Sequence, residues 1–142
     1  MLGVDVGARR VGLAISDPSG TLARPLTTLT VSSEADAVAR VAQAIADAAA
    51  EDDSLGAVVV GLPAHLDGSA SPQTARVTAF IDALRARTSI TIVTEGESLS
   101  SREAESRLAL NERDWRKRKE KLDAAAAAII LQDYLDRTRT EK

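Results

Sequence analysis

Three acidic positions lie far apart in the sequence but could bring their carboxylates together. Asp5 lies inside an apolar strand, Glu95 and Glu97 lie just past a later strand, and Asp123 begins the last predicted helix. Because ligands of α/β proteins bind at the carboxyl ends of the strands, we expect these groups to converge there. Two carboxylates at about 4 Å repel by roughly 4 kcal/mol at an effective dielectric near 20. Such a cluster needs a cation, hydrogen-bond donors or shared protons.

A divalent cation meets that requirement and would bring phosphodiester chemistry with it. Two such ions roughly 4 Å apart activate a water and stabilise the leaving oxygen of an in-line displacement. The chain has no Cys and one His, so Mg²⁺ or Mn²⁺ on oxygen ligands is expected rather than zinc. The alternatives are that Glu97 and Asp123 are solvated helix caps, and that Asp5 caps the turn after its strand. Spacing alone leaves these alternatives open.

Glycines surround the first of these acids. Gly3, Gly7 and Gly12 remove side chains near Asp5 in a predicted β-hairpin. Glycine in a strand weakens it slightly but permits a ligand or another backbone to approach closely. We therefore expect the hairpin to border a close contact.

Basic residues flank the acidic positions on both sides. Residues 112–121, just before Asp123, contain six basic and three acidic side chains. This distribution fits a phosphate backbone that crosses the site, and an aromatic ring there could stack on a base. The predicted nucleic-acid-binding residues are Arg9, Arg10, Arg113, Trp115, Arg116, Lys117, Arg118, Lys119 and Lys121. A solvated charged loop, with its Trp anchored in the core, is the alternative.

Composition indicates one ordinary globular domain. The chain has 142 residues, 44% hydrophobic and 27% charged, with a net charge of −3. This length suits a single domain over residues 1–137, with residues 138–142 as a disordered tail. No signal segment or run of transmembrane length is present in the sequence, so we expect a cytoplasmic protein with no membrane partner.

Hydrophobic periodicity predicts an α/β fold. After the hairpin of residues 1–17, the pattern predicts an edge strand at Thr21–Thr30, a helix at Glu34–Ala50, a central strand at Leu55–Pro63, a helix at Pro72–Arg87, a strand at Ile90–Thr94, a short helix at Ser101–Leu110 and a last helix at Leu122–Leu135. The expected sheet is mixed and five-stranded, with three antiparallel N-terminal strands and two parallel ones, flanked by helices.

Four stretches in this order and spacing carry a family resemblance: Leu2–Ala14, Val58–Pro63 with Asp67–Ser69, Leu99–Glu105 and Leu122–Leu131. The chain resembles the YqgF/RuvX family of RNase H-like nucleases, which comprises pre-16S rRNA nucleases and Holliday-junction resolvase homologues. The resemblance implies an RNase H-like fold in which Asp5, Glu97 and Asp123 bind Mg²⁺ or Mn²⁺ for phosphodiester hydrolysis.

One position departs from the family pattern. The family usually reads Asp-Glu-Arg-Leu before the short helix, whereas this chain reads Gly96-Glu97-Ser98-Leu99. Glu97 is retained, while Gly96 and Ser98 replace an acid and an arginine. Glu95 is therefore an additional candidate metal ligand, and the strength of the site is open.

Three functions are compatible with these observations. The first is an endonuclease on structured nucleic acid, either in 5′-end processing of pre-16S rRNA or on four-way DNA junctions, where paired nicks would need a homodimer. The second is a non-catalytic nucleic-acid-binding protein of the same fold, motivated by Gly96 and Ser98. The third is an actin-like or sugar-kinase-type ATP-binding domain, whose phosphate-binding hairpin is similar but which needs a second domain.

Overall fold

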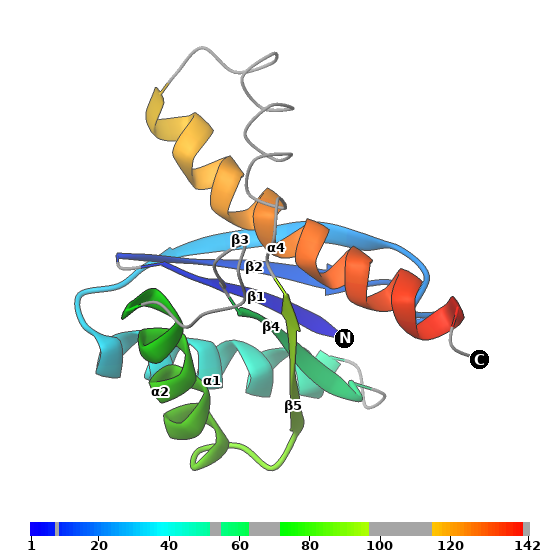
Figure 1. Ribbon diagram of the computed structural model, residues 1–142, viewed down its shortest axis with the longest axis horizontal. Helices are drawn as coiled ribbons and strands as arrows, with labels where there is room; N and C mark the ends of the chain where they lie inside the picture. Colours follow the sequence, from blue (N-terminus) through cyan, green and yellow to red (C-terminus); the bar gives the residue numbers. More distant parts are fainter. Residues whose placement is uncertain (8, 52–54, 63–71, 97–114, 141–142) are drawn as a thin grey trace.

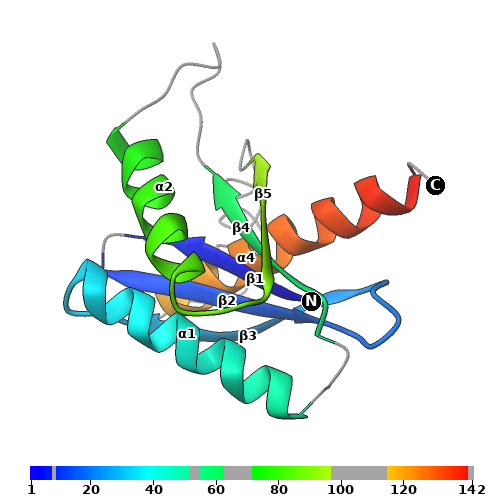
Figure 2. The ribbon, with the colours of Figure 1, turned by 90° about the horizontal axis from the view of Figure 1, so that it is seen from below.

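The computed structural model describes residues 1–7, 9–51, 55–62, 72–96 and 115–140. These residues form one sheet, with α1 and α2 on one face and α4 on the other (Figures 1 and 2). The strands are β1 (Leu2–Val6), β2 (Arg10–Ser16), β3 (Ala23–Thr30), β4 (Ala57–Leu62) and β5 (Thr91–Gly96). The helices are α1 (Glu34–Glu51), α2 (Pro72–Arg85) and α4 (Trp115–Thr140). No described helix is long and apolar enough to cross a membrane.

The sheet has the order β3-β2-β1-β4-β5. The β1–β2 and β2–β3 pairs are antiparallel, and the β1–β4 and β4–β5 pairs are parallel. This arrangement confirms the predicted five-stranded mixed sheet. The Val58–Val60 run lies between two strands and is fully buried, as expected of a parallel strand covered on both faces.

Strand β3 is an edge strand, as Pro25 predicts. Proline cannot donate to a neighbouring strand, and Pro25 pairs with Ala14 at the point where the β2–β3 register shifts. The shift leaves Leu26 as one extra residue on β3, and this residue is 45% exposed. The bulge therefore falls at the outer side of the sheet, away from β1.

Alternation along β1 divides the core into two halves. Leu2, Val4 and Val6 belong to the cluster packed by α1 and α2. Successive strand residues point to opposite faces, so Gly3 and Asp5 face α4. On that side the core is an aliphatic cluster of Ala14, Val59, Ala127, Ala128, Ile130, Leu131 and Leu135. The one polar residue of β1 is thus directed at the last helix.

Two of the predicted glycine positions let α4 lie directly on the hairpin. A Cβ atom on Gly3 would lie 2.8 Å from Leu131 Cβ and 2.9 Å from the Ala127 carbonyl oxygen. A Cβ atom on Gly12 would overlap the carbonyl of Asp123. Contacts this short leave no room for a side chain at either position, so only glycine fits there without a shift of α4. The close approach is therefore by another backbone, one of the two possibilities the sequence left open.

The C-terminal half of α4 is fixed to the β2–β3 connection. Gln132 Oε1 accepts a hydrogen bond from Ala23 N at 2.8 Å, and its Nε2 donates to Thr21 O at 2.9 Å. Asp17 orders the same turn by accepting from Ser19 Oγ and from two backbone amides. Because the Ser19 hydroxyl and these amides stabilise the charged form, the pKa of Asp17 is lowered from 3.8.

We expect Gln132→Ala to lower the free energy of unfolding by about 1–2 kcal/mol, because two partly buried backbone groups lose their partner. Urea denaturation measures the change. Gln43→Ala is the matched control, since Gln43 is exposed on α1 and donates a hydrogen bond to the exposed Asp47 one turn further along the same helix. Its effect should stay within about 0.5 kcal/mol. Equal losses in both variants would contradict a clamping role for Gln132.

Element boundaries differ most at α4. The predicted helix Leu122–Leu135 is extended to Trp115–Thr140, so the basic run is helical instead of a loop. Arg, Lys and Glu are strong helix formers, which explains the extension. Thr138 to Thr140 were predicted as part of a disordered tail, yet they belong to the helix, and Thr138 Oγ1 bonds to Tyr134 O at 2.9 Å. The predicted short helix Ser101–Leu110 lies outside the described residues.

Candidate active site

Two of the three predicted carboxylates are brought together by the hairpin and α4. Gly12 is the cross-strand partner of Asp5 in the β1–β2 pair, so their Cα atoms lie about 5 Å apart. Gly12 in turn contacts the backbone of Asp123, and Ala124 N would lie 2.9 Å from a Cβ placed there. Asp5 and Asp123 therefore occupy neighbouring positions on the α4 face of the sheet, and both are half-buried.

Arg10 forms an ion pair with Asp123. The Nε atom of Arg10 lies 3.1 Å from Asp123 Oδ2, and the two side chains are 33% and 27% exposed. That oxygen itself is buried, so the Arg10–Asp123 contact is partly shielded from water. Arg9, the adjacent residue, is exposed. The sequence predicted the same phosphate-binding role for both arginines, whereas the structure gives them different surroundings.

Glu95 is held by the other end of α4. Arg137 donates from Nη2 to Glu95 Oε2 at 2.6 Å and from Nε to the same oxygen at 3.2 Å. The guanidinium also lies 5.5 Å from the centre of the Tyr134 ring. The Glu95 side chain is only 13% exposed. Its partner is thus an arginine, as is that of Asp123, so the role of Glu95 as an additional metal ligand stays a prediction.

We expect Glu95→Gln to leave the predicted metal-dependent cleavage within about threefold of wild type and to cost about 1 kcal/mol of stability, because the arginine of this ion pair is half-exposed. Initial rates and urea denaturation give the two values. Arg137→Gln should cost more, because it takes this partner away from the largely buried Glu95 carboxylate. A rate loss above about a hundredfold in Glu95→Gln alone would restore Glu95 as a ligand.

The described donors suit a hard divalent cation but do not complete its coordination. Asp5 and Asp123 offer oxygen atoms only, one of them buried, as Mg²⁺ and Mn²⁺ prefer. Within the described ranges no group of three or more His, Cys, Asp or Glu side chains is placed to hold a metal ion. Glu97, the predicted third ligand, lies outside those ranges. The carboxylate pair and its buried oxygen thus fit part of the predicted site.

The predicted nucleic-acid-binding residues fall into two groups. Arg9 and Arg10 lie at the turn beside Asp5. Trp115, Arg116, Lys117, Arg118, Lys119 and Lys121 lie on the first turns of α4, which extend past the sheet (Figure 1). A rise of about 1.5 Å per residue puts the backbone of this run within about 12 Å of Asp123 along the helix. Their side chains, and Arg113 altogether, lie outside the described part.

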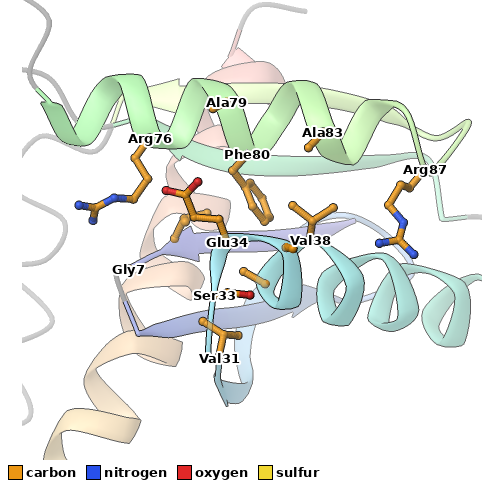
Figure 3. Close-up of a pocket in the computed structure, with 13 residues that line it drawn as sticks. Gly7, Val31, Ser33, Glu34, Val38, Arg76, Ala79, Phe80, Ala83 and Arg87 are labelled. Atoms are coloured by element: carbon orange, nitrogen blue, oxygen red, sulfur yellow. The ribbon is translucent and has the colours of Figure 1, made fainter.

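A separate groove of about 560 Å³ opens between α1 and α2, on the opposite face of the sheet. Figure 3 shows Phe80, Ala79 and Ala83 of α2 facing Val38 of α1 across it. The lining is mainly apolar, and no described carboxylate of the candidate site lies in it. The groove and the carboxylate pair are therefore distinct features of the fold.

Comparison with known proteins identifies the family of this chain. The family model described as "RuvX: Holliday junction resolvase" matches residues 1–137. A protein of Chloroflexus aggregans named "Putative pre-16S rRNA nuclease" is 41% identical over 139 residues, covering 98% of this chain and 94% of the relative. A protein of the same name from Thermoanaerobacter pseudethanolicus is 39% identical over 138 residues, covering 96% and 95%.

Solved structures support the fold. The structure "T. thermophilus RuvC in complex with Holliday junction substrate" superposes with a TM-score of 0.54 at 18% identity, covering 99% of this chain and 97% of that one. A fowlpox virus resolvase bound to Holliday junction DNA gives 0.51 at 12% identity, covering 96% and 97%. The sheet order, the helix on its α4 face and these likenesses identify an RNase H-like fold. With the family model matched over 137 residues, the chain belongs to the RuvX family.

Proposed function

We propose that this protein is a divalent-metal-dependent endonuclease that uses Asp5, Glu97 and Asp123 on structured nucleic acid. The observation that carries the proposal is the placement of Asp5 beside Asp123, across Gly12, on one face of the sheet. A half-buried pair of acids of this kind is costly without positive charge beside it, which a divalent cation would supply. The nuclease names of the relatives and the resolvase fold of the structural neighbours support the same class of reaction.

Each side chain has a distinct task in this proposal. Asp5 and Asp123, with Glu97, would hold Mg²⁺ or Mn²⁺, which supplies an activated water and charge stabilisation at the phosphate. Asp5 is positioned by the β1–β2 ladder and Asp123 by the contact of α4 with Gly12. The exposed Arg9 and the basic turns of α4 would bind the backbone phosphates on either side. The protein is proposed to act in the cytoplasm.

The test is cleavage of a pre-16S rRNA leader and of a four-way DNA junction, run in parallel with Mg²⁺, with Mn²⁺ and with EDTA. We expect metal-dependent cleavage of at least one substrate and none with EDTA. The preferred substrate then decides between rRNA processing and junction resolution. If the junction is cut by paired nicks, sedimentation should show a homodimer, since two sites are needed.

The alternative of a non-catalytic binding protein rests on Gly96 and Ser98, which replace an acid and an arginine of the family pattern. Tight binding of both nucleic acids without metal-stimulated turnover would favour it. The ATP-binding alternative has less support, because the matched family is one of nucleases. An ATP titration that shows no binding would dismiss it.

A further inference from the structure

Arg10 takes the place next to Asp123 where the proposed mechanism needs a metal. Its Nε lies 3.1 Å from the buried Oδ2 of that residue. A second cation at the same carboxylate would be repelled by the guanidinium in a site of limited water access. Metal binding and the Arg10–Asp123 pair therefore compete, and this competition separates Arg10 from the exposed Arg9.

The strand register explains why Arg10 reaches Asp123. Arg10 lies two residues before Gly12 on β2, so both side-chain positions face α4. Because Gly12 has no side chain, nothing on β2 itself stands between Arg10 and the first part of the helix that contacts Gly12. The backbone of Arg10 is fixed, since its carbonyl accepts from Gly7 N at 2.8 Å. Only the side chain, one-third exposed, can move.

The charges of the described site suggest where the guanidinium goes. Two carboxylates, Asp5 and Asp123, and one guanidinium give one net negative charge. With the proposed third ligand Glu97 the net charge becomes −2, which one divalent cation neutralises, and the phosphodiester group of the substrate then supplies a negative partner for the guanidinium. Arginine is well suited to that exchange, because its planar donors fit both carboxylate and phosphate.

We propose that Arg10 is an exchangeable counter-ion. It neutralises Asp123 in the metal-free protein, and when a divalent ion binds, it passes to the phosphate of the substrate. The inference rests on the proposed function, since it requires that Asp5 and Asp123 hold the metal. It gives Arg10 two successive partners and Arg9 only the nucleic acid.

The experiment is a calorimetric Mn²⁺ titration of the full chain without nucleic acid, for wild type, Arg10→Gln, Arg10→Lys, Arg9→Gln and Asp5→Asn. Arg10→Gln should bind Mn²⁺ about three- to tenfold more tightly than wild type, because the competing cation is gone. The Mn²⁺ affinity of Arg10→Lys should lie between those of wild type and Arg10→Gln, because lysine keeps the positive charge on a shorter side chain. Arg9→Gln, with the same loss of charge at an exposed position, should change affinity by less than about twofold.

A second measurement tests the substrate phosphate, which is the other proposed partner of Arg10. In the cleavage assay Arg10→Gln should raise the KM for nucleic acid by about tenfold while its Mn²⁺ affinity improves, a combination that simple loss of structure does not produce. If wild type binds Mn²⁺ and both Arg10 variants bind it with the same affinity, the proposed exchange of partners by Arg10 is overturned, but the proposed function is not. If wild type does not bind Mn²⁺, or if Asp5→Asn binds it as tightly as wild type does, the proposed function is overturned as well.

Discussion

Asp5→Asn is expected to reduce metal-dependent cleavage by at least about a thousandfold. The amide is a neutral, weaker ligand in place of a carboxylate, and several kcal/mol of transition-state stabilisation by a metal correspond to a loss of this size. The fold should persist, because Asn matches Asp in shape and the change removes a charge that faces Asp123 across Gly12. Single-turnover rates with Mg²⁺ and with Mn²⁺ measure the loss.

The matched control for this substitution is Asp47→Asn. Asp47 is an exposed residue of α1, on the other face of the sheet, where it accepts a hydrogen bond from Gln43. Its replacement changes net charge equally but should leave cleavage within about twofold. Circular dichroism and urea denaturation should place Asp5→Asn within about 1 kcal/mol of wild type. Cleavage undiminished by Asp5→Asn would remove Asp5 from the site.

Gly12→Ala is the second substitution with a large expected effect. Its Cβ would overlap the carbonyl of Asp123, so α4 would have to move away from β2. Overpacking of this kind costs about 1–3 kcal/mol, and the upper end is expected because both partners are backbone. The displaced helix also carries Asp123, so cleavage should fall by about a hundredfold or more, as misplacement by about 1 Å can cost that much.

Gly96→Ala provides the control, since a Cβ there would meet nothing within 4 Å. The stability of that variant should lie within about 0.5 kcal/mol of wild type or slightly above it, because alanine restricts the unfolded chain. Urea denaturation of both variants makes the comparison. A Gly12→Ala protein as stable as Gly96→Ala would show that the contact between α4 and β2 can relax.

The fold was predictable because local signals agreed with the final arrangement. The alternation of Leu2, Val4 and Val6 marked a strand with one polar face, and the unbroken valines of β4 marked a strand buried on both sides. Pro25 indicated an edge position, which the sheet order confirms. The start of α4 was missed because a run of charged residues has no apolar face that would indicate a helix. Arginine and lysine nevertheless have high intrinsic helix propensity.

The candidate site was less predictable, since its geometry depends on contacts between distant segments. The sequence indicated that something would approach Gly3 and Gly12 but not that α4 would do so. It also grouped Arg9 with Arg10, because a sequence pattern does not show which of two neighbouring side chains has an ion-pair partner. The pairs Arg10–Asp123 and Arg137–Glu95 join residues whose proximity exists only in the folded chain.

The long separation of β1 and α4 in the sequence has a consequence for protein synthesis. Asp5 is synthesised 118 residues before Asp123 (123 − 5), so the face of the sheet around it stays uncovered until Ala127 to Leu135 can pack there. Synthesis proceeds at about 5–20 residues per second, so an incomplete chain holds one half of the carboxylate pair for several seconds. If the proposed function is right, the nascent protein is inert toward nucleic acid until its last helix docks.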